Sequence, residues 1–331
     1  MALLLNESNV KAILTMPMAL DAVEESFRRL AEGSMHLHSR QRLRVPGKSY
    51  LHYMAAADET GGYMGLKIYS SSKEGLRFVV PLFSADSGDM LALIEADFLG
   101  QMRTGAASGV ATRVMGREDA RTVGIIGSGL QARTQLEAIA QVRKIEWARV
   151  YSRSALRRET FAGEMTKTVG FPVTAAMSAE VAIREADIVV ASTTSTAPVI
   201  EGRWLRAGTH INAIGANFPQ KRELDDAAVG RADVIAVDSR EQSRQESGDL
   251  IQSLDGDPAR WDAVLELADI VSGRVPGRTN AQQITLFKSN GIATEDIAVA
   301  ARVYEIARER GIGREIPMWE REARPADSRG V

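Results

Sequence analysis

The residues best suited to chemistry form a glycine-rich loop between an apolar run and a helix-like segment. The loop reads Gly127-Ser128-Gly129-Leu130-Gln131-Ala132, a G-x-G-x-x-A pattern. In such loops the first glycine permits a tight turn, the second lets the backbone approach a pyrophosphate, and a small third residue allows close helix–strand packing. The anion then lies on free N–H groups at the helix N-terminus. We therefore predict dinucleotide binding here; a glycine-rich turn without a ligand is the alternative.

A second candidate group stands at the end of the next strand-like run, ARVYS. An acidic residue usually binds the adenosine ribose hydroxyls at this place, but here the chain has Ser152, Arg153 and Ser154. A guanidinium and two hydroxyls suit a 2′-phosphate, so NADP(H) is preferred over NAD(H), which stays possible. The alternative is that these residues begin a solvated helix. Thr193, which follows the run DIVVA, is a further candidate for cofactor contact.

Lys67 is the candidate for proton transfer. In the segment YMGLKIYS it shares one strand face with Gly65 and Tyr69, while Met64, Leu66 and Ile68 share the other. A lysine on a half-buried strand is costly unless it meets an anion or loses its proton. Either outcome suits catalysis, but an outward, solvated lysine fits the same pattern.

These residues require two kinds of scaffold. Residues 15–33 predict a helix with Leu20, Val23 and Phe27 on one face, and short strand-like runs follow to about residue 96, which favours an antiparallel sheet. From about residue 120, apolar runs alternate with helix-like segments, as in a parallel, doubly wound sheet. The runs are TVGIIG, ARVYS, DIVVAST, HINAIG, VIAVD and DIVSG, and a last helix follows Asp296.

Composition excludes several classes of protein. The chain has 331 residues, a formal net charge of −2 and no cysteine. It therefore lacks the strong basic charge that attracts nucleic acid or anionic membranes, and it offers no thiolate chemistry. Its four histidines, His36, His38, His52 and His210, form no metal-binding pattern, so we predict no metal site. The N-terminus resembles no signal peptide, and we expect a cytoplasmic protein.

Several motifs together resemble the ornithine cyclodeaminase/μ-crystallin family over nearly the whole chain. They are MRTGAASGVAT at 102–112, VGIIGSGLQA at 123–132, HINAIGANFPQKRELD at 210–225, ESGDL at 246–250 and ITLFKSNGIATEDIA at 284–298. The resemblance implies a Rossmann domain over 114–302. It also implies a substrate-binding and dimerisation domain made of residues 1–113 and the returning segment 303–331. The homodimer of this family joins two antiparallel sheets.

The resemblance also assigns roles to individual residues. It makes Lys67 the catalytic lysine and places Arg103 and Arg42 on the substrate carboxylate, with Thr104 near the cofactor phosphates. Arg40 and Arg44 lie on the same strand face as Arg42, so that assignment could slip by two residues, or the cluster could be an exposed basic edge. Lys288 and Ser289 match a motif near the nicotinamide, although a plain loop before a helix would look the same.

Two departures from the family pattern bear on the reaction. Asn217 replaces the aspartate that serves as acid–base in cyclodeaminases, and Met54 aligns with their acidic side-chain contact. Both favour an imine or a small apolar side chain over ornithine. The predicted function is an NAD(P)H-dependent oxidoreductase acting on the C–N bond of an α-imino or α-amino acid, such as a cyclic Δ1-imine carboxylate. A cyclodeaminase that uses NAD catalytically and a crystallin-like binding protein are the alternatives.

Overall fold

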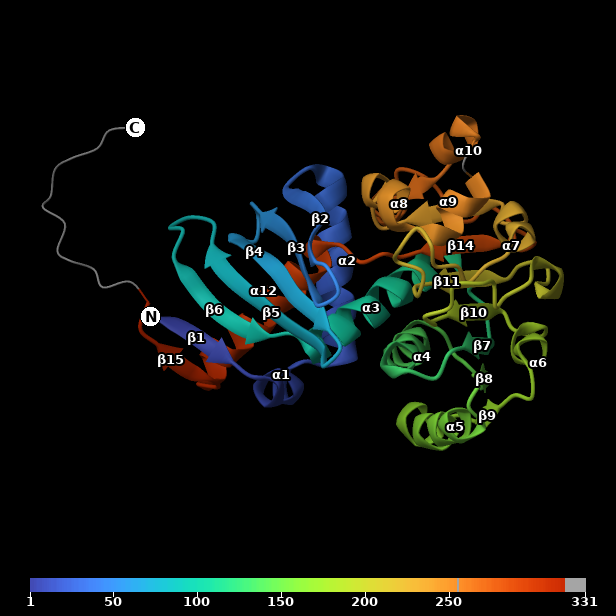
Figure 1. Cartoon of the computed structure of the whole chain (residues 1–331), viewed down its shortest axis with the longest axis horizontal. Helices are drawn as coiled ribbons and strands as arrows, with labels where there is room; N and C mark the ends of the chain where they lie inside the picture. The colour runs from blue at the N-terminus through green and yellow to red at the C-terminus, as the bar shows by residue number, and fades with distance from the viewer. Residues whose placement is uncertain (255, 319–331) are drawn as a thin grey trace, which may run out of the picture.

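The protein is built around two β-sheets, which Figure 1 shows side by side. The structure, a computed structural model, describes residues 1–254 and 256–318. Helix α3 (Asp97–Met115) and the segment that leads from β14 (Thr285–Lys288) to α12 (Ala293–Arg310) run between the sheets. No helix in the described part of the chain is long and apolar enough to cross a bilayer.

The first sheet has seven strands in the order β15-β1-β6-β5-β4-β3-β2. Neighbouring strands are antiparallel except β1 and β6, which run parallel. The predicted antiparallel sheet is thus confirmed with one parallel pair at its β1 side. The strands are β1 (Ala2–Leu5), β2 (Met35–Val45), β3 (Ser49–Asp58), β4 (Tyr63–Ser72), β5 (Gly75–Ser84), β6 (Met90–Glu95) and β15 (Arg314–Ile316).

The second sheet has eight parallel strands in the order β13-β12-β14-β11-β10-β7-β8-β9. Chain order reverses beside β7, between β8 and β10, as the predicted doubly wound fold requires. The strands are β7 (Thr122–Ile126), β8 (Trp147–Tyr151), β9 (Val173–Ala175), β10 (Ile188–Ala191), β11 (His210–Ala213), β12 (Val234–Val237), β13 (Leu265–Glu266) and β14.

Helices cover both sheets, and one predicted strand is in fact helical. DIVSG falls on α11 (Leu267–Val271) and its end, because such a short apolar run does not distinguish a strand from a buried helix turn. The remaining helices are α1 (Glu7–Ile13), α2 (Met16–Glu32), α4 (Leu130–Val142), α5 (Ala155–Val169), α6 (Ala179–Ile183), a 3₁₀ turn (Gly202–Trp204), α7 (Asp226–Gly230), α8 (Arg240–Glu246), α9 (Gly248–Leu254) and α10 (Pro258–Asp262).

Helix α2 forms as the sequence predicts. Its face with Leu20, Val23 and Phe27 is buried in the core of the first sheet, where α12 and α3 also pack. The helix ends at Gly33, whose left-handed backbone (φ 83°) lets its N–H bond the carbonyls of the last turn. Burying each such side chain contributes about 1.5–3 kcal/mol.

The predicted domain boundaries, 1–113 with 303–331 and 114–302, stay a prediction. Helix α12 begins at Ala293 and packs along β3 and β4, so its first turn already belongs to the layer over the first sheet. Residues beyond 318, including part of the predicted returning segment, lie outside the described residues.

Candidate active site

The glycine-rich loop has the form of a dinucleotide cradle. It follows β7 and opens α4, and Gly127 has φ 111°, where a Cβ atom would lie 2.2 Å from the Ser192 carbonyl oxygen. A Cβ on Gly129 would meet nothing within 4 Å, so open space stands at the helix N-terminus. Among the described residues no side chain caps that end of α4, and Gln131 Oε1 is buried without a partner. These features fit a phosphate-bearing cofactor.

The end of β8 lies directly beside this loop. Ser128 Oγ is 2.9 Å from Ser152 Oγ, and the Ser154 side chain caps α5 by accepting a hydrogen bond from the Arg157 N–H. The Arg153 side chain is exposed and has no partner within the described residues. The Arg158 guanidinium donates to the Ser152 carbonyl at 2.9 Å instead of pointing freely outward. Of these two arginines, Arg153 is the one free to bind an anion.

A buried carboxylate ties together two strand ends of the second sheet. Glu223 accepts hydrogen bonds from the Thr193 N–H after β10 and from the Gly215 N–H after β11, at 2.5 and 2.7 Å. Burial, with the nearby Asp249 carboxylate, raises the pKa of Glu223 to about 7. Thr193 therefore sits at the carboxyl edge of the sheet, where ligands bind in folds of this kind.

Lys67 points from β4 to the covered face of the first sheet. Its side chain is 3% exposed, and Nζ donates to Asp296 Oδ1 at 2.7 Å. Burial, together with the Arg103 charge, lowers the pKa of Lys67 to about 8, although Asp296 opposes the shift. Gly65, two residues earlier, leaves room for Ile297 of α12. The outward, solvated lysine of the alternative interpretation is excluded.

Arg103 reaches the same carboxylate from α3. Its Nε donates to Asp296 Oδ1 at 3.1 Å and its Nη1 to Glu295 Oε2 at 2.7 Å. Burial alone lowers the pKa of Arg103, but Asp296 and Glu295 outweigh that effect and raise it. Burial raises the pKa of Glu295 to about 8. Thr104, the next residue, bonds back to the Gly100 carbonyl inside α3.

The cluster of arginines on β2 is divided between the site and the scaffold. Arg40 is buried and pairs with Glu246 at 2.6 Å, while its Nη2 donates to the carbonyls of Asn290 and Gly291. Arg42 is part-exposed; it pairs with the other oxygen of Glu246 at 2.6 Å and lies 4.5 Å from the Phe218 ring centre. An exposed basic edge is thus wrong for Arg40 and Arg42. The charge of Arg40 contributes to lowering the pKa of Lys67, and Arg42 donates a hydrogen bond to the Asn217 carbonyl at 3.3 Å.

The remaining predicted residues come from the second sheet. Asn217 accepts from Lys221 Nζ at 3.3 Å, and its carbonyl accepts from Arg42. Lys288 ends β14 and is fully buried; Nζ donates to the Ala213 and Ser289 carbonyls and lies 3.7 Å from Asp249. Ser289 donates to Asp238 Oδ2. Lys288 and Ser289 are therefore buried at the carboxyl end of β14, where both hydrogen-bond to other residues of the protein.

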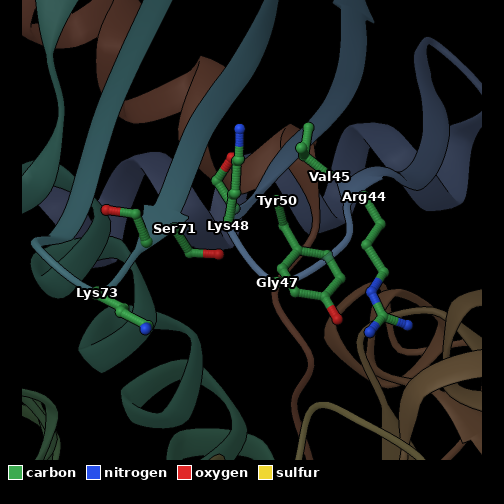
Figure 2. Close-up of a pocket in the computed structure, with 9 residues that line it drawn as sticks. Arg44, Val45, Gly47, Lys48, Tyr50, Ser71 and Lys73 are labelled. Atoms are coloured by element: carbon green, nitrogen blue, oxygen red, sulfur yellow. The ribbon is translucent and has the colours of Figure 1, made fainter.

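Three stacked rings from β3, β4 and β5 lie on the same face of the first sheet as Lys67. The His52 and Tyr69 rings stack at 4.2 Å, and Phe78 stacks on Tyr69 at 5.0 Å. Burial and the charges of Arg42 and Arg40 lower the pKa of His52 to about 4, so this histidine is neutral. Beyond it, the β2–β3 and β4–β5 turns enclose a surface hollow of about 380 Å³ lined by Arg44, Tyr50, Ser71 and Lys73 among others (Figure 2).

Sequence reasoning missed the acidic half of this site. The motifs at 284–298 and 246–250 contain Glu295, Asp296 and Glu246, but the sequence alone assigns these three acids no role. A usable signal for Glu295 and Asp296 is the mainly apolar sequence that follows them, since an unpaired charge in a buried helix is too costly. No cluster of three or more potential metal ligands occurs in the described part of the chain.

The parallel second sheet and its glycine-rich loop define a Rossmann-type α/β protein, and the first sheet carries a buried lysine–arginine–carboxylate cluster. The ornithine cyclodeaminase/mu-crystallin family profile matches residues 2–311. The chain is 39% identical to a Δ1-pyrroline-2-carboxylate reductase of Bacillus cereus over 245 residues, 74% of this chain and 75% of that protein.

Two solved structures have the same fold throughout. The Δ1-pyrroline-2-carboxylate reductase of Thermococcus litoralis, in complex with NADH and L-proline, has a TM-score of 0.91 and 37% identity, covering 95% of this chain and 100% of that one. An archaeal alanine dehydrogenase dimer with bound NAD has a TM-score of 0.90 and 32% identity, covering 96% and 99%. The chain belongs to the ornithine cyclodeaminase/mu-crystallin family, and the predicted family and fold class are confirmed.

Proposed function

We propose that the protein reduces the C=N bond of a cyclic α-imino acid to the corresponding amino acid, as a ketimine reductase. The broader class, a nicotinamide-dependent oxidoreductase acting on the C–N bond of imino or amino acids, is confirmed by its relatives. The observation that carries the finer proposal is the buried pairing of Lys67 and Arg103 on one carboxylate, Asp296. A proton donor and a carboxylate-binding group are thereby held side by side.

In this reaction each group on the chain has a defined task. A reduced nicotinamide cofactor, when held at the glycine-rich loop, would supply the hydride for this reduction. The Lys67 ammonium gives its proton to the imine nitrogen and becomes a neutral amine, which water protonates again. Arg103, with Arg42, binds the substrate carboxylate and so fixes the orientation of the C=N bond. Such general acid assistance is typically worth about 10²–10⁴-fold in rate.

The residues proposed to hold the cofactor lie along the carboxyl edge of the second sheet. Gly127, Gly129 and the first turn of α4, with Leu130, Gln131 and Ala132, would hold the pyrophosphate. Thr193, Lys288 and Ser289 would shape the nicotinamide end, and Thr104 on α3 would lie near the cofactor phosphates. We further propose that Ser152, Arg153 and Ser154 favour NADP(H), since Arg153 is free and no carboxylate of the described residues pairs with it. The neighbours named above hold NADH and NAD.

We also propose a homodimer formed through the outer face of the first sheet. Leu43 and Leu51 are cross-strand partners on the face opposite to His52 and are 59% and 41% exposed. Met64, Leu66 and Ile68 continue that face on β4. Apolar side chains gathered in this way are typical of an interface. The molar mass from light scattering is expected to be twice that of the 35.9 kDa chain, and Leu51→Glu should lower it.

The function is tested by a panel of substrates with both cofactors. Five- and six-membered cyclic imine carboxylates, pyruvate with ammonia or an amine, and ornithine are each incubated with NADPH or NADH, and nicotinamide absorbance and the amino acid formed are measured. We expect stoichiometric oxidation of the cofactor with the cyclic imines. Loss of the signal in Lys67→Ala, with cofactor binding retained, assigns it to this site. Wild-type protein that binds cofactor but reduces no imine would overturn the proposal.

A further inference from the structure

The Asp296 carboxylate is shared by the two cations of the site. Its Oδ1 lies 2.7 Å from Lys67 Nζ and 3.1 Å from Arg103 Nε, and the side chain is 0% exposed. We propose that Asp296 is a positioning residue that keeps Lys67 protonated as the proton donor and holds Arg103 at a fixed place beside it. The catalytic part of this inference rests on the proposed function. The protonation state of Lys67, however, can be measured without turnover.

The shared oxygen fixes which donors remain for a substrate. Lys67 gives one of its three N–H donors to Asp296, and Arg103 gives Nε to Asp296 and Nη1 to Glu295. Within residues 1–254 and 256–318, Arg103 Nη2 has no hydrogen-bond partner. The site thus presents one free guanidinium nitrogen and two free ammonium hydrogens, held at one carboxylate. A substrate carboxylate and imine nitrogen on adjacent carbon atoms require donors that are this close together.

Charge around Lys67 explains why Asp296 is required. Arg103 from α3 and Arg40 from β2 both disfavour the ammonium, as burial does, and the Phe78 ring of β5 lies 5.5 Å from Nζ. Glu295 from α12 pairs with Arg103, whereas Asp296 favours the Lys67 ammonium both by its charge and by its hydrogen bond. Without it, a buried amine among guanidinium groups would be neutral at ordinary pH and would have no proton to give.

The position of Asp296 in the fold also distinguishes it from a structural acid. Acidic residues in the first turn of a helix usually stabilise the helix from the surface. Asp296 is instead fully buried, and its Oδ2 has no hydrogen-bond partner among the described residues. A buried oxygen without a partner costs about 1–3 kcal/mol. If position 296 served packing alone, an apolar residue there would be more stable than a carboxylate. The two cations that Asp296 binds therefore explain why the position is acidic.

The experiment is an NMR titration of the lysine side chains in wild-type protein and in Asp296→Asn, which keeps the size of the side chain and removes its charge. Lysine labelled with ¹³C at the ε position reports protonation, and Lys67→Arg assigns the signal. We expect the Lys67 midpoint to fall by roughly 1–3 pH units in Asp296→Asn. Glu295→Gln is the matched control: it removes the neighbouring acid, which contacts Arg103, and should shift the midpoint by less than half as much.

Kinetics then separate positioning from structure. In Asp296→Asn, the pH above which imine reduction declines should move down together with the NMR midpoint, so that kcat near pH 8 falls about fivefold or more. Cofactor dissociation constants should stay as in the wild type. An unchanged Lys67 midpoint in a folded Asp296→Asn protein would overturn the proposal, whatever its activity.

Two further outcomes keep the two proposals apart. If Asp296→Asn does not fold, the ¹³C signal of the Asp296 carboxyl in the wild-type protein serves instead: it should shift at the Lys67 midpoint, and its failure to do so sinks the proposal. If the midpoint moves as expected but no imine is reduced by wild-type protein, the proposed function fails while the role of Asp296 at Lys67 stands.

Discussion

Met54 and Lys67 are direct partners across β3 and β4, and Met54 Sδ also lies 3.7 Å from Arg40 Nη2. A fully buried thioether therefore stands at the position that we expect to match the acidic side-chain contact of cyclodeaminases. Asn217, part-exposed at the other side of Arg42, carries no titratable proton either. The site offers apolar surface and an amide to the substrate side chain, with its carboxylates committed to the arginines and lysine.

The first prediction concerns ornithine. With no acid at position 54 or 217, nothing there binds or deprotonates a second amino group, so we expect no ammonia from ornithine in the presence of NAD. Ammonia is measured enzymatically, and reduction of a cyclic imine by the same preparation serves as the positive control. Release of ammonia from ornithine at a rate comparable to imine reduction would favour the cyclodeaminase alternative.

Removal of the lysine amine should separate chemistry from binding. Lys67→Ala is expected to lower kcat for imine reduction by about 10²-fold or more, because the proton donor is lost. The glycine-rich loop is untouched, so the NADPH dissociation constant, measured by nicotinamide fluorescence, should change little. Lys73→Ala, on an exposed turn after the same strand, is the matched control and should behave as the wild type. Near-normal turnover in Lys67→Ala would assign the proton to another group.

The pH dependence of the wild-type enzyme follows from the Lys67 pKa of about 8. Reduction uses the ammonium, so its rate should be constant below that pKa and fall about tenfold per pH unit above it. Oxidation of the amino acid uses the neutral amine and should rise with pH through the same value. The two directions are compared at saturating cofactor. Parallel pH profiles in both directions would mean that Lys67 is not the group that transfers the proton.

Sequence alone predicted the parts of this site that repeat in every Rossmann fold and failed where distant segments meet. The loop at Gly127, the alternating strands and the buried face of α2 can each be predicted from the spacing of residues within one short stretch of chain. The pairing of Lys67 with Asp296 joins residues 229 positions apart, and that of Arg40 with Glu246 joins residues 206 apart. Local patterns do not show which distant residues meet, so they did not identify Asp296 as the partner of Lys67.

The buried pairs between β2 and α8 should be important for stability. Glu246 is paired with both Arg40 and Arg42, and the Arg40 and Glu246 side chains are almost fully buried. Glu246→Ala leaves the Arg40 charge buried without its partner, which typically costs about 3–5 kcal/mol. Arg42→Ala removes a part-exposed group and should cost less. Urea unfolding of both variants is the measurement; equal losses would mean that burial of Arg40 does not control the effect.

The choice of cofactor is tested at Arg153. Arg153→Ala removes a charge-assisted contact to the 2′-phosphate, worth about 1.5–3 kcal/mol, so the NADPH dissociation constant should rise about 10–100-fold. The dissociation constant for NADH should stay within about twofold, because NADH has no 2′-phosphate and so loses no contact when Arg153 is removed. Arg184→Ala, another exposed arginine of the same domain, is the control for net charge. Equal weakening of both cofactors by Arg153→Ala would remove the phosphate-pocket assignment.

The two glycines of the loop should respond differently to the same substitution. In Gly127→Ala the new methyl group would collide with the Ser192 carbonyl at a backbone angle that disfavours alanine, and we expect a loss of more than about 1 kcal/mol in stability. In Gly129→Ala the methyl group enters open space at φ −83°, so thermal stability should be unchanged. Cofactor binding should nevertheless weaken in Gly129→Ala, because the methyl group occupies the space that the pyrophosphate approaches. Unfolding curves and cofactor titrations of both variants test this, and a Gly129→Ala protein that binds cofactor as tightly as the wild type would place the pyrophosphate elsewhere.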